Sequence, residues 1–324
     1  FGWSVAPSSM AAVVVRAAES ETMAERTLKN IAEKQREIFA AAEKKGDKLD
    51  QEAFRTQVQS LTHEYERLLR DNPKFALAAA AYGGLLGKVG LRKEAAAMLL
   101  KANQLDSDIP FVKNQLGGYL AEEGKPLEAA PYFLAAIKLA PDEPIYHYQL
   151  ATLLVEARDD FIRSGAWTRA TLDEAMTTGF KRAAELAPDS ADARNDLGSA
   201  LAGAGRPREA VVAFAQAVRL APRLLAARVN LGNALGAIGR WDDAITQFEA
   251  AVKLSPENAD AHTRLGISLV NAGRPAEAVA AYVAALRLKP GDAALHEQFG
   301  QVLTALGRRA EALIQLERAA ELRR

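Results

Sequence analysis

The chain has 324 residues, of which 49% are hydrophobic and 25% are charged, a balance typical of a folded protein. Lys plus Arg and Asp plus Glu each number 41, so the net charge is zero and no overall positive field is available to neutralise nucleic-acid phosphates. Because cysteine is absent, disulfides, thiolate metal sites, attached c-type haem and cysteine nucleophiles are excluded.

The N-terminal region predicts an extended arm followed by a helical hairpin. Residues 1–9 have no apolar period of their own, so we expect an arm there. Residues 10–45 carry apolar side chains at helical spacing, Gly46 breaks that pattern, and a second helix is expected over about 49–70. Residues 10–75 therefore predict a hairpin that precedes the rest of the fold.

Two expectations concern targeting. No apolar run approaches the roughly 18 to 20 residues that a membrane-spanning helix needs, so no span is predicted. The chain begins at Phe1 rather than at Met, which is typical of a trimmed or processed chain and favours an exported protein whose signal peptide has been removed.

From residue 76 onward one sequence motif recurs: a glycine, a second glycine seven residues later, then an alanine, a large apolar residue and another alanine. The steps from 83 to 117, from 198 to 232, from 232 to 266 and from 266 to 300 are equal, and each spans one 34-residue period. A fixed period of this size indicates a stack of similar helical units rather than one globular core. The first glycines of the six clear copies are Gly83, Gly117, Gly198, Gly232, Gly266 and Gly300.

Each copy predicts an antiparallel pair of helices, as residues 191–222 illustrate. Leu197 and Leu201 lie on one stripe of a first helix, and Gly205 ends it. Pro207 stands where a second helix begins. Proline is favoured there because the backbone N–H that it lacks would have no partner within the helix at that position. Phe214 lies on the apolar stripe of the second helix, and the unit cannot bury that stripe alone.

The 34-residue period with these anchors resembles the tetratricopeptide repeat family. The first-helix Trp of that motif is missing throughout, and Ala151 replaces the first glycine in one copy. The resemblance implies an all-α fold, a right-handed superhelical α-solenoid of antiparallel helix pairs. It implies a solenoid over 76–324 with about seven repeats, at 76–109, 110–143, 144–190, 191–224, 225–258, 259–292 and 293–324.

The third copy is irregular. The step from Ala151 to Gly198 is longer than the 34-residue period by 13 positions. The extra stretch, roughly 158–172, contains Phe161 and Trp167 among charged residues, and insertions in solenoids often mark a binding face. Two interpretations stay open: the aromatic side chains pack back on the stack, or Trp167 contacts a partner.

No pattern of residues predicts catalysis, a cofactor or a metal. Three of the four histidines, His147, His262 and His296, share one register position, but no cysteine or carboxylate cluster completes a ligand set. Gly117 and Gly118 lie inside a segment with helical periodicity, so we expect them to allow close helix packing rather than to form a phosphate-binding turn. We therefore expect a protein that is not an enzyme.

The residues that precede the first-helix Leu or Phe form a polar series. In proteins of the family that the chain resembles, this position faces the concave groove. Because an amide offers both donors and acceptors, a ladder of such side chains fits an extended peptide, and the alternative is a solvated inner face without a ligand. The predicted groove residues are Gln115, Gln149, Asp196, Asn230, Arg264 and Gln298, with Asn233 and Gln301 three residues further along.

The two ends of the sequence suggest a second function. The last helix keeps Leu316, Ala319 and Leu322 at interior-type positions without a capping helix after them, and the arm carries Phe1, Trp3 and Val5. A head-to-tail contact between such ends makes rings or filaments. The sequence thus predicts a scaffold that binds a protein or peptide partner, or alternatively a structural subunit that assembles with itself. Nucleic acid is not an expected partner.

Overall fold

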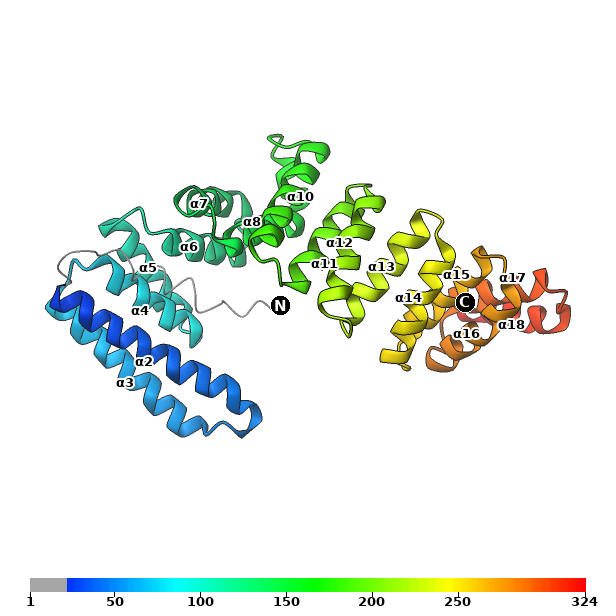
Figure 1. The fold of residues 1–324 in the computed structure, drawn as a ribbon, viewed down its shortest axis with the longest axis horizontal. Coiled ribbons are helices and arrows are strands. Elements are labelled where there is room, and N and C mark those ends of the chain that lie inside the picture. Colours follow the sequence, from blue (N-terminus) through cyan, green and yellow to red (C-terminus); the bar gives the residue numbers. More distant parts are fainter. Residues whose placement is uncertain (1–21) are drawn as a thin grey trace. The chain divides into compact units, whose positions relative to one another are not determined.

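The computed structural model describes residues 22–324, and the predicted arm over 1–9 and the start of the predicted 10–45 helix lie outside them (Figure 1). Within the described residues there are seventeen α-helices, one short 3₁₀ helix and no strand. Consecutive helices pack as pairs, and the predicted all-α class and α-solenoid architecture are confirmed. No helix in this part of the chain combines the length and the apolar character required to cross a bilayer.

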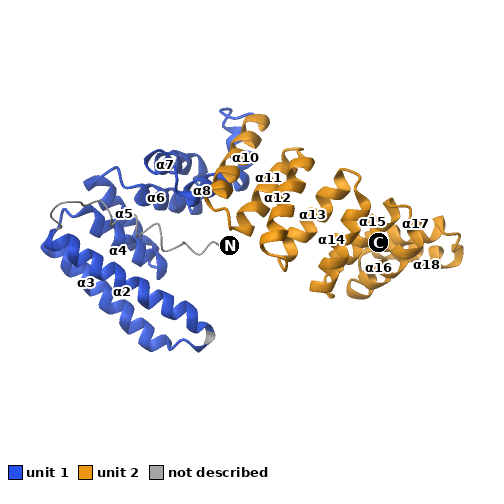
Figure 2. Cartoon of the chain, in the orientation of Figure 1, with its two compact units in different colours: residues 1–168 blue, residues 169–324 orange. Residues whose placement is uncertain are grey.

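The chain divides into two compact units, residues 1–168 and residues 169–324 (Figure 2). The boundary falls inside the predicted third repeat, 144–190, whose second half begins unit 2. The helices of unit 1 are α2 (Met23–Lys45), α3 (Gln51–Asp71), α4 (Ala76–Lys88), α5 (Arg92–Leu105), α6 (Pro110–Glu122), α7 (Pro126–Leu139), α8 (Pro144–Glu156) and α9 (Arg158–Arg163), with the 3₁₀ helix η1 (Gly46–Lys48) after α2.

Unit 2 has the same alternation of paired helices. Its first member is longer than the others because part of the inserted sequence extends it. The helices are α10 (Arg169–Leu186), α11 (Ala191–Gly203), α12 (Pro207–Leu220), α13 (Leu225–Ala237), α14 (Trp241–Leu254), α15 (Ala259–Asn271), α16 (Pro275–Leu288), α17 (Ala293–Ala305) and α18 (Arg309–Leu322).

Helix ends in the N-terminal hairpin follow local capping chemistry. At the start of α2, the Thr22 hydroxyl accepts a bond from the Glu25 backbone N–H at 3.2 Å, and the Glu25 carboxylate accepts one from the Thr22 N–H at 2.7 Å. Gly46 follows α2 with φ of +48°, a conformation that L side chains rarely adopt. The Asp50 carboxylate caps α3 by accepting two backbone N–H bonds, at 3.1 and 3.0 Å.

The hairpin shares its core with the first repeat. Tyr65 of α3 is fully buried, its hydroxyl donates to Gln35 Oε1 of α2 at 2.9 Å, and its ring stacks on Tyr82 of α4 with centroids 5.5 Å apart. Burial, and then the negative charge of Glu64, raise the pKa of Tyr65 above its usual range, which keeps the phenol neutral and able to donate. Tyr65 therefore joins α2, α3 and α4 into one packed body.

Inside each repeat the first glycine allows two helices to approach closely. A Cβ atom at Gly198 would lie 2.6 Å from the ring of Phe214, and one at Gly232 would lie 2.7 Å from the ring of Phe248. The second glycine has a different role, since Gly205 adopts φ of +75° and ends α11. The first glycine of the repeated motif thus allows helix packing, and the second ends the first helix.

The inserted stretch of the third copy forms the short helix α9 and a turn. Phe161 on α9 is 2% exposed and meets the ring of Trp167 edge-to-face, with centroids 6.1 Å apart. Trp167 itself is half-buried. Phe161 is a core residue and cannot itself touch a partner, so a partner contact by Trp167 stays a prediction for the exposed part of its ring.

The exposed apolar residues of the last helix, α18, differ from those that were predicted to take part in assembly. Ala319 is 3% exposed within the α17–α18 pair, so it cannot contact another molecule directly, and Leu322 is half-buried. Leu316 is 37% exposed, while Leu313 and Ile314 are 57% and 61% exposed. Phe1, Trp3 and Val5, the other predicted assembly residues, lie outside the described residues.

Candidate functional site

In unit 2 the first helices of successive pairs form a continuous surface. Helix α11 contacts α13 and α13 contacts α15, in addition to the contacts within each pair. Side chains on the shared side of these helices can therefore bond from one repeat to the next. We call the surface of α11, α13 and α15 the inner face of unit 2.

Polar side chains link the three helices across this face. The Asn230 side-chain N–H donates to Asn195 Oδ1 at 3.0 Å, and the guanidinium of Arg264 donates to Asn233 Oδ1 at 2.7 Å. Arg264 also donates to the carboxylate of Asp260 on its own helix, at 2.8 Å. Three of the predicted groove residues, Asn230, Asn233 and Arg264, thus lie on one surface and make bonds that span repeats.

Asn195 is a site residue that sequence reasoning missed. It lies next to the predicted Asp196, whose carboxylate accepts a bond from the Asn195 side chain at 3.3 Å. Asn195 and Asn230 are 35 residues apart, one more than the period, and this offset is the signal that was available. Asn230 thus reaches the preceding first helix one register position earlier than a strict 34-residue repeat implies, whereas Arg264 reaches Asn233, which is 31 residues away.

Apolar residues occupy the same registers in other repeats. Val229 stands one repeat period after Asn195, Ile267 stands one repeat period after Asn233, and both are half-buried. The inner face therefore mixes amide groups with apolar side chains. A surface of this kind suits a polypeptide, because amides can bond the main chain while apolar positions receive side chains.

The two remaining predicted residues of unit 2 do not join this network. Gln301 on α17 is exposed, whereas the side-chain oxygen of Gln298 is buried without a hydrogen-bond donor. A buried oxygen of this kind costs about 1–3 kcal/mol relative to one that is bonded. Gln298 is thus an unsatisfied acceptor near the end of the stack.

Unit 1 carries the equivalent surface on α6 and α8, which contact one another. Of its predicted residues, Gln115 is half-buried, and Gln149 has a buried side-chain oxygen without a donor. Asn114, beside Gln115, is 4% exposed, and its side-chain oxygen also lacks a donor, as does the hydroxyl of Thr152. Each such group costs about 1–3 kcal/mol. Asn114 and Thr152 were not predicted from the sequence.

The paired glycines of α6 differ from each other. A Cβ at Gly117 would lie 3.2 Å from the ring of Phe133, as expected for a close-packing glycine. At Gly118 no heavy atom lies within 4 Å of the same position, so the expectation of close packing is wrong for this residue. Gly118 is one helical turn after Asn114 and leaves open space on that side of α6.

The histidines that share a register have a structural contact in common. A ring nitrogen lies 2.7 Å from the Pro141 carbonyl oxygen in His147, 2.9 Å from that of Pro256 in His262, and 3.1 Å from that of Pro290 in His296. Each ring therefore fastens the loop that enters its own helix. In the part of the chain that the structure describes, no group of three His, Cys, Asp or Glu residues is placed to hold a metal.

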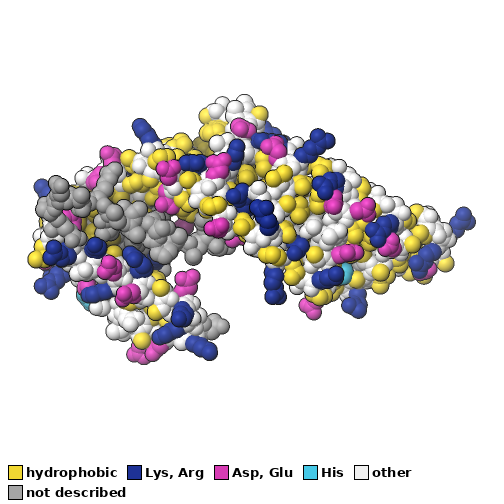
Figure 3. Space-filling view, viewed as in Figure 1, with side chains coloured by type: hydrophobic (Ala, Val, Ile, Leu, Met, Phe, Trp, Pro, Cys, Tyr) yellow, Lys and Arg dark blue, Asp and Glu magenta, His cyan; other side chains and the backbone are white. Residues whose placement is uncertain are grey.

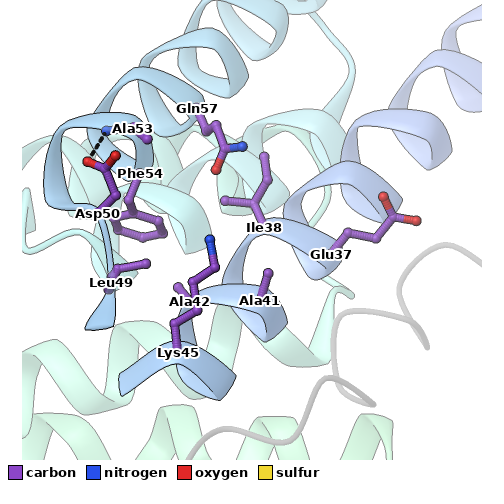
Figure 4. Close-up of a pocket in the computed structure, with 10 residues that line it drawn as sticks. All are labelled: Glu37, Ile38, Ala41, Ala42, Lys45, Leu49, Asp50, Ala53, Phe54 and Gln57. Carbon is purple, nitrogen blue, oxygen red and sulfur yellow. Dashed lines mark hydrogen bonds between the residues drawn. The ribbon is translucent and has the colours of Figure 1, made fainter. Parts of the chain in front are cut away.

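Two hollows lie along the N-terminal hairpin, and neither has the character of a small-molecule site. One, of about 300 Å³, lies between the end of α2 and the start of α3 (Figure 4). Ile38 and Phe54 line it together with Lys45, but Asp50, its nearby carboxylate, is engaged in capping α3. The other, of about 490 Å³, lies between the start of α2 and the end of α3.

The surface charge is mixed. On the face drawn in Figure 3, Lys and Arg side chains alternate with Asp and Glu side chains over both units. Many of these charges pair locally, as Arg206 does with Glu209 at 2.7 Å and Arg274 with Glu277 at 2.7 Å. Such exposed pairs contribute little to stability, and no field of one sign marks a binding surface on this face.

Comparisons with known proteins agree with the fold of paired helices. The tetratricopeptide repeat family model matches residues 179–224, 229–293 and 263–324. Over these residues the chain is similar to the tetratricopeptide repeat family. The repeats upstream of residue 179 lie outside the match, although the helix pairs α4–α5 and α6–α7 pack in the same manner.

A solved structure has the same fold. YrrB, described as a tetratricopeptide repeat protein with an unusual peptide-binding site, is 22% identical, covers 61% of this chain and 95% of its own, and superposes with a TM-score of 0.53. A MamA structure is 23% identical over 53% of this chain and 91% of its own, with a TM-score of 0.46. Another, MamA from Desulfovibrio magneticus RS-1, is 22% identical over 53% and 94%, also at 0.46. A search of curated proteins found no match.

Proposed function

We propose that the protein is a scaffold that binds an extended peptide segment of a partner protein along the inner face of unit 2. The observation that carries this proposal is a set of two hydrogen-bonded pairs, Asn195 with Asn230 and Asn233 with Arg264, each of which joins two neighbouring repeats. The tetratricopeptide repeat fold supports it at the level of architecture, since this fold is that of protein-interaction scaffolds.

The chemistry of the face favours an extended main chain. Each amide uses only part of its hydrogen-bonding capacity within the protein, because one Asn offers two N–H groups and an oxygen with two lone pairs. Val229 and Ile267 pack partly against the core, and the part of each side chain that remains exposed suits apolar side chains of the peptide. The peptide-binding site that the description of YrrB states for that protein is consistent with this use of the fold.

A titration tests the proposal. Peptides are selected from a random display library on the full chain and then titrated by fluorescence anisotropy. We expect Asn230→Glu with Arg264→Glu to weaken binding at least tenfold, because a tenfold change needs only about 1.4 kcal/mol and two hydrogen-bonding groups are replaced by negative charge.

The control carries charge changes of the same sign on other helices. Arg219→Glu with Arg287→Glu alters two exposed residues of the second helices α12 and α16, and it is expected to leave the affinity unchanged. Equal weakening by both double variants would point to a general charge effect and would contradict the proposed site.

Self-association is a second candidate function, and the exposed apolar residues of α18 favour it. Leu316 stands one repeat period after Tyr282, whose ring stacks on Phe299 of the following helix with centroids 5.8 Å apart. Within the chain this register is therefore covered by the first helix of another repeat. We propose that a second copy of the protein covers Leu313, Ile314 and Leu316.

Sedimentation velocity tests the second candidate. The unaltered chain is expected to form species larger than a monomer as its concentration rises, and Leu313→Glu with Ile314→Glu to remain monomeric, because two buried carboxylates would be desolvated at the contact. Val283→Glu on α16, where Val283 is 51% exposed, serves as the control and should assemble normally. An unaltered chain that stays monomeric at high concentration rules the contact out.

A further inference from the structure

The hollow between the end of α2 and the start of α3, which we call the hairpin groove, is not covered by another described helix. Every residue that lines it belongs to α2, α3 or the link between them. Ile38 of α2 and Phe54 of α3 lie on opposite sides of its apolar floor (Figure 4). Elsewhere on the hairpin, by contrast, the ring of Phe39 is covered by the ammonium of Lys88 on α4, 5.3 Å from its centroid. The groove is thus a two-helix surface that a third helix can cover.

Two opposite charges stand at the rim of the groove. Glu37 and Lys45 both line it, and they are eight residues apart on α2, which is about 12 Å along the helix axis. Both side chains are exposed, and neither has an ion-pair partner among the described residues. Ala41 lies between them and also lines the groove. The α2 side of the groove is therefore apolar in the middle, negative at one end and positive at the other.

Helix α18 carries the reverse order of charges around its exposed leucines. Arg309 and Glu317 are also eight residues apart, both are exposed, and neither has an ion-pair partner in the described part of the chain. Leu313 and Leu316, 57% and 37% exposed, lie between them on the same side of the helix. Along α18 the positive charge comes first, whereas along α2 the negative charge comes first.

The repeat register indicates which kind of element covers this side of α18. Val279 and Tyr282 of α16 stand one repeat period before Leu313 and Leu316, and both pack in one apolar cluster with residues of α17. Within the chain, this side of a second helix is therefore covered by another helix. An uncovered surface of this kind suits a helical partner better than an extended one.

We propose that α18 of one copy lies in the hairpin groove of a second copy, with its exposed leucines against the apolar floor. Arg309 then faces Glu37 of the second copy and Glu317 faces its Lys45, because the equal spacing brings both pairs together when α18 runs parallel to α2. This proposal rests on the self-association proposed above, and it names the surface of the second copy that covers α18.

The contact joins two different surfaces, one from each unit, so it does not close into a two-fold dimer. A pair of copies keeps one free hairpin groove and one free α18. Further copies can therefore add at both ends, and assembly continues into a ring or an open filament.

Sedimentation velocity on the full chain tests the apolar part of the contact. Ala41→Glu places a carboxylate in the groove, where the leucines of α18 would strip its water, and the association constant is expected to fall at least tenfold. Ala40→Glu is the matched control, because Ala40 is also exposed on α2 but does not line the groove. This control should assemble as the unaltered chain does.

An exchange of charges tests the pairing and its direction. One double variant carries Glu37→Lys with Lys45→Glu in the groove, and the other carries Arg309→Glu with Glu317→Arg on α18. Each alone is expected to assemble at least tenfold more weakly, because its contacts bring like charges together. An equimolar mixture is expected to recover assembly, because each groove then meets an α18 of matching charge on the other variant.

Two results would overturn the hairpin groove as the partner of α18. The first is that Ala41→Glu assembles as well as Ala40→Glu, and the second is that the mixture assembles no better than its two components. If assembly is nevertheless lost in Leu313→Glu with Ile314→Glu, the contact of α18 stands and only its partner surface is wrong. An unaltered chain that stays monomeric at high concentration rules out both proposals together.

Discussion

Replacing Gly198 by alanine is expected to lower the free energy of unfolding by about 3 kcal/mol, at the upper end of the range for overpacking a protein core. The added methyl group would stand 2.6 Å from the ring of Phe214, which is 2% exposed. The helices α11 and α12 must therefore separate or the ring must leave its place. Urea denaturation followed by circular dichroism measures the loss.

Gly203→Ala on the same helix is the control, since no heavy atom lies within 4 Å of a Cβ at that position. It is expected to be neutral or to stabilise the helix by up to about 1 kcal/mol, the usual difference in helix propensity between alanine and glycine. Similar losses from both substitutions would show that the loss of a glycine itself, rather than the contact with Phe214, controls stability.

Replacing Tyr65 by alanine is expected to cost about 4 kcal/mol, as large aromatic truncations in buried sites do. The ring is fully buried, contacts Tyr82 of α4 and bonds to Gln35 of α2, so its removal loosens the hairpin from the first repeat. Hydrogen exchange read by mass spectrometry should show faster exchange in α2 and α3, while unit 2 keeps its protection.

Tyr65→Phe separates the ring from its hydroxyl. This variant keeps the stacking on Tyr82 and loses only the 2.9 Å bond to Gln35, so a loss of about 1 kcal/mol is expected. If the two substitutions cost the same, the hydrogen bond rather than the packed ring holds the hairpin, and the proposed role of the ring is wrong.

Much of the fold could be predicted from the sequence because its determinants are local. The glycine that packs a helix pair and the residue that meets it, such as Gly198 and Phe214, lie within one repeat, on its first and second helix. The glycine that ends the first helix, such as Gly205, acts through its own φ angle. A period of such signals predicts the repeated pair without reference to any other part of the chain.

The candidate sites depended instead on contacts between repeats. Asn230 was predicted as a groove residue, but its partner Asn195 was not, because pairing depends on how far one helix pair is displaced against the next. Similarly, Ala319 has an interior-type position in sequence and is indeed buried, whereas Leu313 and Ile314, which no pattern singled out, are the exposed apolar residues of α18.

By itself, the sequence of this protein determined the helix pairs and their order, because glycine conformation, proline position and apolar spacing act within a few turns of helix. Only the tertiary structure decided which polar side chains meet. Two amide pairs share the same spacing along the chain, yet Asn195 and Asn230 are bonded while the oxygens of Asn114 and Gln149 are not. A hydrogen bond requires its heavy atoms within about 3 Å, and spacing along the chain does not specify distances between helices so finely.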